Sequence, residues 1–138
     1  MALKVGEKFT YSERIDESQP LLYAAAAGEY FTPRHIDSNY ARSLGYPDIL
    51  IDGFLTMGLV SKAVVTAIED PRLLLEFHLK YKAPVFVKDT LDISIEVAQE
   101  TEKTIMLKID VQNQEGQKVF DSGYAVIRNS NGGPPNMD

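Results

Sequence analysis

A run of apolar residues at positions 54–68 constrains the fold of this chain more than any other feature. It reads Phe-Leu-Thr-Met-Gly-Leu-Val-Ser-Lys-Ala-Val-Val-Thr-Ala-Ile, follows Asp52 and Gly53, and ends before Asp70 and Pro71. Aspartate is a favourable helix N-cap, and the residue before a proline is disfavoured in a helix. A helix that is apolar around most of its circumference belongs in a protein interior. The run therefore predicts one long, buried helix.

The chain after this helix alternates between apolar and polar residues. Such alternation, with a period of two, predicts strands that have one buried face. Residues 113–116 (Asn-Gln-Glu-Gly) have the composition of a hairpin turn. The expected strands are 73–82, 91–97, 104–111 and 117–127, with an earlier one at 8–14, and in the first of them the apolar residues at 75, 77, 79 and 81 share a face.

Two shorter helices are expected before the long one. Pro20 fits only the first turn of a helix, so the first of these starts near Ser18 and stops at Gly28. The second has Asp37 as its N-cap and Gly45 as its stop. Helices and strands together give an α+β fold, in which an antiparallel sheet packs one face against a buried helix.

Composition excludes several classes of function. The chain has 138 residues, a net charge of −6, two histidines and no cysteine. Scattered basic residues argue against nucleic-acid binding, no apolar run is long enough to cross a bilayer, and two distant histidines make no metal site. We expect a cytoplasmic protein with one domain at 1–128, no cofactor and a flexible Gly- and Pro-rich tail at 129–138.

The segment before the long helix holds the residues best suited to chemistry. His35 lies in a turn-rich stretch close to Glu29, and histidine is the side chain that most readily exchanges a proton near neutral pH. The backbone N–H of Gly53, in the first turn of the helix, is a natural donor to a developing oxyanion. Asp52 is expected to act mainly as the helix cap. For His35 alone, a polar loop histidine is the simpler interpretation, and Glu29 fits an exposed charge equally well.

Four motifs in order resemble the MaoC-like enoyl-CoA hydratases and dehydratases, which have the hot-dog fold. The family stretch Ala-x-x-Ser-Gly-Asp-x-Asn-Pro-x-His-x-Asp is matched at 24–37 by Ala-Ala-Ala-Ala-Gly-Glu-Tyr-Phe-Thr-Pro-Arg-His-Ile-Asp. The other three are Tyr-Ala at 40–41 with Gly-Tyr-Pro at 45–47, Asp-Gly-Phe-Leu-Thr-Met-Gly at 52–58, and Lys-Ala-Pro-Val-Phe-Val-Lys-Asp at 82–89. The resemblance covers roughly residues 5–128.

The resemblance implies hydration of a trans-2-enoyl thioester of coenzyme A or an acyl carrier protein, or the reverse dehydration, by a homodimer or larger assembly. His35 and Glu29 would hold the water, and the Gly53 N–H would polarise the thioester carbonyl. Substrate contacts are expected from Tyr30, Asp52, Phe54 and Arg34, and Arg34, Lys82 and Lys88 could pair with phosphates, although surface charge is the simpler interpretation.

Three departures from the family pattern leave alternatives open. The family acid lies five residues before its histidine, whereas Glu29 lies six before His35, so Tyr30 could take the place of the acid. Asp52 replaces a histidine or serine, and Lys88 replaces a glycine. A hot-dog thioesterase that uses Asp52, and a non-catalytic subunit that binds acyl thioesters, therefore remain rival interpretations. His78, on the polar face of its strand, has no expected role.

Overall fold

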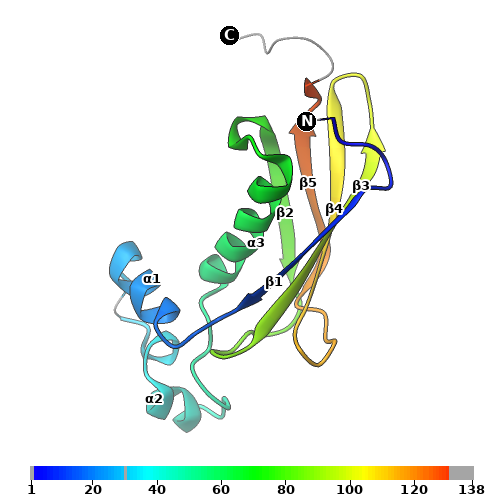
Figure 1. Ribbon diagram of the computed structural model, residues 1–138. Helices are drawn as coiled ribbons and strands as arrows, with labels where there is room; N and C mark the ends of the chain where they lie inside the picture. Colours follow the sequence, from blue (N-terminus) through cyan, green and yellow to red (C-terminus); the bar gives the residue numbers. More distant parts are fainter. Residues whose placement is uncertain (1, 30, 131–138) are drawn as a thin grey trace.

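The computed structural model describes residues 2–29 and 31–130 of the chain. Its centre is an antiparallel five-stranded sheet with strand order β1-β3-β4-β5-β2. A single long helix, α3 (Gly53–Ile68), lies along one face of this sheet (Figure 1). This confirms the α+β class and the predicted long helix. The strands are β1 (Lys8–Arg14), β2 (Leu74–Tyr81), β3 (Thr90–Glu100), β4 (Thr104–Gln112) and β5 (Phe120–Arg128).

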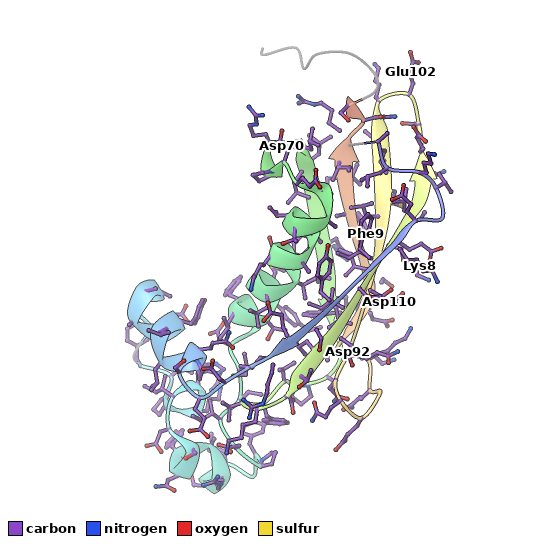
Figure 2. All side chains as sticks on the ribbon, viewed as in Figure 1. Lys8, Phe9, Asp70, Asp92, Glu102 and Asp110 are labelled. Carbon is purple, nitrogen blue, oxygen red and sulfur yellow. The ribbon has the colours of Figure 1, made fainter. Side chains whose placement is uncertain are left out.

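The core forms between α3 and the inward side chains of the strands. Strand β4 and the part of β3 up to Val97 alternate between inward and outward side chains, so Ile93, Ile95 and Ile109 are buried. Asp92 and Asp110 lie on the sheet face that points away from α3 (Figure 2). Burying an aliphatic side chain contributes about 1.5–3 kcal/mol, which makes this helix–sheet contact the main source of stability. The helix contributes Thr56, Leu59, Val60, Ala63, Val64, Ala67 and Ile68.

The long helix is less buried in the single chain than its apolar sequence predicts. Residues spaced four apart on α3 form a stripe that the sheet does not cover. Phe54, at one end of this stripe, is 67% exposed. Only one side of α3 faces the sheet, because a single sheet can cover only one side of a helix. The stripe consists of Phe54, Gly58, Lys62 and Thr66.

The apolar face predicted for β2 is only partly buried. Leu79 is buried, but Leu75 and Tyr81 are each about half exposed. The pairing of β2 with β5 shifts register twice, between Leu74 and Glu76 and between His78 and Lys80. Such irregularities change the direction in which side chains leave a strand. In addition, β2 is an edge strand and has a neighbour on one side only.

The first helices form a separate layer at one end of the molecule. Helix α1 (Gln19–Ala27), the 3₁₀ turn η1 (Pro33–His35) and helix α2 (Ser38–Ser43) lie beside the start of α3 (Figure 1). The predicted Pro20 start, Asp37 cap and Gly28 stop are confirmed. Gly28 adopts φ 72°, a left-handed conformation that glycine allows at little cost. This layer carries Glu29 and His35 toward the first turn of α3.

The ordered fold extends further than predicted at its C-terminal end. Asn129, which the sequence assigned to the flexible tail, is buried. Its side-chain amide donates hydrogen bonds to Glu100 Oε1 at 3.0 Å and to the Thr101 carbonyl at 2.9 Å. The Gly- and Pro-rich composition of the tail did not indicate that Asn129 is ordered. The residue packs against the β3–β4 hairpin. The remainder of the predicted tail, 131–138, lies outside the described residues, and no described helix has the length and apolarity needed to span a bilayer.

Candidate active site

The candidate site lies where the α1–α2 layer meets the N-terminus of α3. Glu29 follows the end of α1, and His35 is the last residue of η1. Asp52 is the N-cap of α3, and Gly53 is the first residue of that helix. Residues that are 24 positions apart in the sequence therefore meet at one point, because the layer folds back onto the helix start.

The ring of His35 is fixed by a backbone contact. Its Nδ1 lies 2.5 Å from the carbonyl oxygen of Leu50. A carbonyl can only accept, so Nδ1 carries the hydrogen and donates it. In the neutral ring, Nε2 then has a free lone pair, which is the form required of a base. The Nε2 atom lies 3.8 Å from Asp52 Oδ2, and both side chains are largely shielded from solvent, with exposures of 17% and 15%.

Asp52 uses its two carboxylate oxygens for different contacts. Oδ1 accepts the backbone N–H of Phe54 at 2.8 Å, which confirms the predicted helix cap. Oδ2 faces the ring of His35. The carboxyl group of Asp52 also shares a hydrogen bond with that of Glu29. This bond and the negative charge of Asp52 raise the pKa of Glu29, with a smaller effect from burial, while a positive charge on His35, when the ring is protonated, acts in the opposite direction.

The first turn of α3 presents an unpaired donor to this site. Within the described residues, the N–H of Gly53 has no hydrogen-bond partner, since the Asp52 carboxylate accepts from Phe54 instead. The phenol of Tyr81 donates to the Gly53 carbonyl at 2.7 Å. A Cβ added at Gly53 would lie 3.1 Å from the Tyr81 ring, so a side chain at this position would crowd the ring. The helix dipole makes this N–H a favourable position for negative charge.

Two hollows meet at His35. The larger has a volume of about 330 Å³ and is lined by Arg34, His35 and Gly53, with Tyr81 and Lys82 on the strand side. The smaller lies between α1 and α3, and it is lined by Glu29, Asp52 and Tyr23 together with apolar residues of both helices. His35 thus lies between the larger cavity and the small hollow.

The structure brings four of the predicted site residues together and separates others from them. His35, Glu29, Asp52 and Gly53 form the group described above. Arg34 lines the larger cavity, whereas the exposed Phe54 lines neither described cavity. Tyr30, the alternative acid, lies outside the described residues.

The remaining basic residues differ in position. Lys82 lines the larger cavity, but Lys88 pairs with Glu17 at 3.2 Å, away from the site. Lys88 has φ 74°, so it holds the left-handed conformation that explains why the family usually has glycine there. His78 stacks on Tyr124 with ring centroids 5.1 Å apart. Within 2–29 and 31–130, no three potential metal ligands come together.

Two tyrosines at the site were not anticipated from the sequence. Tyr81 contacts Gly53, and Tyr23 lines the small polar hollow. Burial and the negative charge of Asp52 raise the pKa of both phenols, so both stay protonated as hydrogen-bond donors. The signal for Tyr81 was its place at the end of a strand just before the Lys-x-Pro-Val-Phe motif, on the face directed toward the long helix.

Sequence comparison places these features in a known family. A model of the MaoC like domain matches residues 2–119. The chain belongs to the MaoC-like domain family. The (R)-specific enoyl-CoA hydratase of Aeromonas caviae is 27% identical over 129 residues, which cover 92% of this chain and 96% of that enzyme. The (R)-specific enoyl-CoA hydratase of Rhodospirillum rubrum is 27% identical over 96 residues, 69% of this chain and 66% of that enzyme.

Solved structures of MaoC-like proteins have the same fold. The unliganded R-hydratase PhaJ1 from Pseudomonas aeruginosa aligns with a TM-score of 0.82 at 31% identity, over 91% of this chain and 81% of that one. The (R)-hydratase from A. caviae aligns with a TM-score of 0.79 at 26% identity, over 91% and 96% of the two chains. These similarities show that the chain has the hot-dog fold.

Proposed function

We propose that this MaoC-like protein hydrates trans-2-enoyl-CoA to (R)-3-hydroxyacyl-CoA and catalyses the reverse dehydration. One observation carries the proposal: the lone pair of His35 Nε2, a carboxyl group and the unpaired N–H of Gly53 meet at the start of α3. Hydration of a conjugated thioester needs a base, an acid and an oxyanion donor. Family membership and the named activities of the relatives support the same reaction.

Each group has one task in the proposed reaction. Nε2 of His35 takes a proton from water while the water oxygen bonds to the β-carbon of the substrate. The π electrons move toward the thioester oxygen, whose negative charge the N–H of Gly53 stabilises. Glu29 then donates its proton to the α-carbon as the carbonyl re-forms. The net reaction adds one water across the double bond. Transfer of one proton from His35 to Glu29 then regenerates the site.

The larger cavity is the proposed place of the acyl thioester. It includes Gly53, and Arg34 and Lys82 at its wall can pair with phosphates of coenzyme A or of an acyl carrier protein. The uncovered stripe of α3 and the half-exposed Leu75 and Tyr81 on edge strand β2 support a homodimer. We further propose that the protein acts in cytoplasmic fatty acid metabolism, since a chain without cysteine needs no oxidising compartment.

The arrangement of Asp52 favours hydration over the thioesterase alternative. A thioesterase would use this carboxylate to attack the thioester carbonyl or to activate water for that attack. Here one oxygen of Asp52 caps the helix, and the carboxyl group is hydrogen-bonded to Glu29. A carboxylate with these partners is a poor nucleophile, because attack would require both contacts to break.

The decisive experiment uses purified protein and trans-2-enoyl-CoA substrates of several chain lengths. Hydration is expected to remove the absorbance of the conjugated thioester without releasing free thiol, and chiral analysis should show the (R)-alcohol. Free thiol would support a thioesterase instead. Ligand-induced stabilisation without turnover would support a non-catalytic binding subunit, and either result would overturn the proposal.

Replacement of Gly53 by alanine tests the proposed role of the Gly53 N–H as the oxyanion donor. The new Cβ would press on the Tyr81 ring, displace it and narrow the approach to the N–H. We expect kcat/KM to fall by about 10- to 100-fold, because small misplacements at a reacting centre have effects of this order. The free energy of unfolding should change by only about 1 kcal/mol, because better helix propensity offsets the lost hydrogen bond.

Gly58→Ala provides the matched control for this prediction. Gly58 is in the same helix, and a Cβ added there meets nothing within 4 Å. Its activity should equal that of the wild type. Equal kcat/KM values for Gly53→Ala and Gly58→Ala, both measured by the absorbance assay, would remove Gly53 from the mechanism.

A further inference from the structure

Asp52 connects the proposed acid to the proposed base. Its carboxyl group is hydrogen-bonded to Glu29, and its Oδ2 atom lies 3.8 Å from Nε2 of His35. Its position is fixed independently of both, because Oδ1 accepts the N–H of Phe54 at the start of α3. Asp52 is therefore a rigid part of the site, while Glu29 follows a short helix whose buried residues are few.

A hydrogen bond between two carboxyl groups requires one proton. Two ionised carboxylates have only acceptor atoms and repel each other, so neither can donate. A hydrogen bond between Glu29 and Asp52 therefore needs at least one proton on the pair, and a pair that holds one proton keeps one negative charge. Asp52 already uses Oδ1 as an acceptor for a backbone N–H, and the carboxyl group whose pKa the Glu29–Asp52 contact raises is that of Glu29. The proton accordingly belongs mainly to Glu29.

We propose that Asp52 is a positioning residue that shares one proton with Glu29 and so keeps Glu29 in the acid form that the reaction needs. The proposal rests on the hydratase function inferred above. It also gives a reason for the aspartate that replaces the usual histidine or serine before Gly53. In this chain the second carboxylate supports an acid that lies one residue out of the usual register.

The total charge of His35, Glu29 and Asp52 does not change during the proposed reaction. Before the reaction, the Glu29–Asp52 pair carries one negative charge and His35 is neutral. After His35 has taken the proton of water and Glu29 has protonated the α-carbon, the pair carries two negative charges and His35 one positive charge. The sum is unchanged, and the new imidazolium lies next to Asp52. Transfer of one proton from His35 to the carboxyl pair then restores the starting state.

The other polar groups near the pair are compatible with one shared proton. Tyr23 lines the same small hollow, and Tyr81 contacts the neighbouring Gly53; burial and the negative charge of Asp52 raise the pKa of both, so both are neutral phenols. His35 is the nearest group that can become positive. Arg34 and Lys82 line the larger cavity instead, on the substrate side of His35.

The test is a titration of Glu29 in the full-length protein and in Asp52→Asn. The ¹³C signal of the Glu29 carboxyl group, assigned by its loss in Glu29→Gln, should titrate above the ordinary glutamate range in the wild type. In Asp52→Asn it should titrate at lower pH, because the asparagine amide donates to the ionised form and the neighbouring charge is gone. The asparagine oxygen still caps α3, so the helix start is preserved.

Asp70→Asn is the matched control. Asp70 also accepts a backbone N–H, from Arg72, and lies at the opposite end of α3 (Figure 2). It should leave the Glu29 titration unchanged. In kinetics with crotonyl-CoA, the high-pH decline of kcat/KM should move to lower pH in Asp52→Asn only. For each unit of displacement, activity above the decline falls about tenfold, since the protonated fraction falls by that factor.

The outcomes separate this inference from the hydratase proposal. A Glu29 signal that titrates identically in the wild type and in Asp52→Asn would overturn the shared proton, even if the enzyme hydrates crotonyl-CoA. A displaced titration in a protein that turns over no enoyl-CoA would support the carboxyl pair and overturn the hydratase function. A pH profile that moves equally in Asp52→Asn and Asp70→Asn would reject a specific role for Asp52.

Discussion

Replacement of His35 by alanine is expected to lower kcat/KM for enoyl-CoA hydration by about 10²- to 10⁴-fold, the usual contribution of a general base. The expectation rests on the ring orientation: Nδ1 donates to the Leu50 carbonyl, which leaves Nε2 as the basic atom. No other described imidazole can substitute, because His78 is stacked on Tyr124 in the β2–β5 pair. The decay of conjugated thioester absorbance measures the effect.

Because His35 also holds the loop before α3, the experiment needs a variant that separates the two roles. The amide nitrogen of asparagine occupies roughly the place of Nδ1, so His35→Asn can still donate to the Leu50 carbonyl but offers no base. It should be as inactive as His35→Ala and melt closer to the wild type. His78→Ala should retain full activity. Substantial activity in His35→Asn would show that the histidine serves only to hold the loop.

Replacement of Glu29 by glutamine is expected to lower kcat/KM by about 10²-fold or more, the lower end of the range for general acids. The glutamine amide can donate a hydrogen bond to Asp52, so the local packing is retained, but it has no proton to give to the α-carbon. Hydration rates measured with the same absorbance assay, together with the melting temperature, report both effects.

Glu17→Gln supplies the control for loss of charge. Glu17 precedes α1 and is paired with Lys88 on the surface, so its replacement should leave hydration unchanged. Wild-type rates in Glu29→Gln would exclude Glu29 as the acid. In that case Tyr30, the alternative that the family register suggests, would be tested next by Tyr30→Phe.

The fold could be predicted because the patterns that encode it are local. Strict alternation defined β4 and residues 91–97 of β3, and Asp37, Asp52 and Gly28 marked helix ends through their own backbone preferences. What failed were properties set by distant neighbours. The exposure of Tyr81 depends on bulges and on the edge position of β2, which alternation cannot report. The burial of Asn129 depends on a hairpin that it contacts only in three dimensions.

The sequence predicted which residues lie at the site but not which of them contact one another. Motif spacing indicated His35, Glu29 and Gly53, and the structure brings all three to the start of α3. Their proposed roles await the experiments above. Asp52 was expected mainly to cap the helix, and it does so with one oxygen. Its contact with Glu29 was not foreseen, because η1 and α2 lie between the two residues in the sequence and only their three-dimensional arrangement brings the chain back to this point.

The uneven burial of the two halves of the site has a consequence for its dynamics. Gly53 belongs to a helix packed on the sheet, whereas Glu29 and His35 belong to a layer in which α1 buries only Pro20 and Ala24. Segments with few buried apolar contacts open locally at a lower free energy than the whole domain unfolds. Opening of this layer would separate acid and base from the oxyanion donor while the sheet stays intact. We therefore expect heating to abolish the proposed chemistry through local opening of residues 19–29 and 31–43, before the hot-dog core melts.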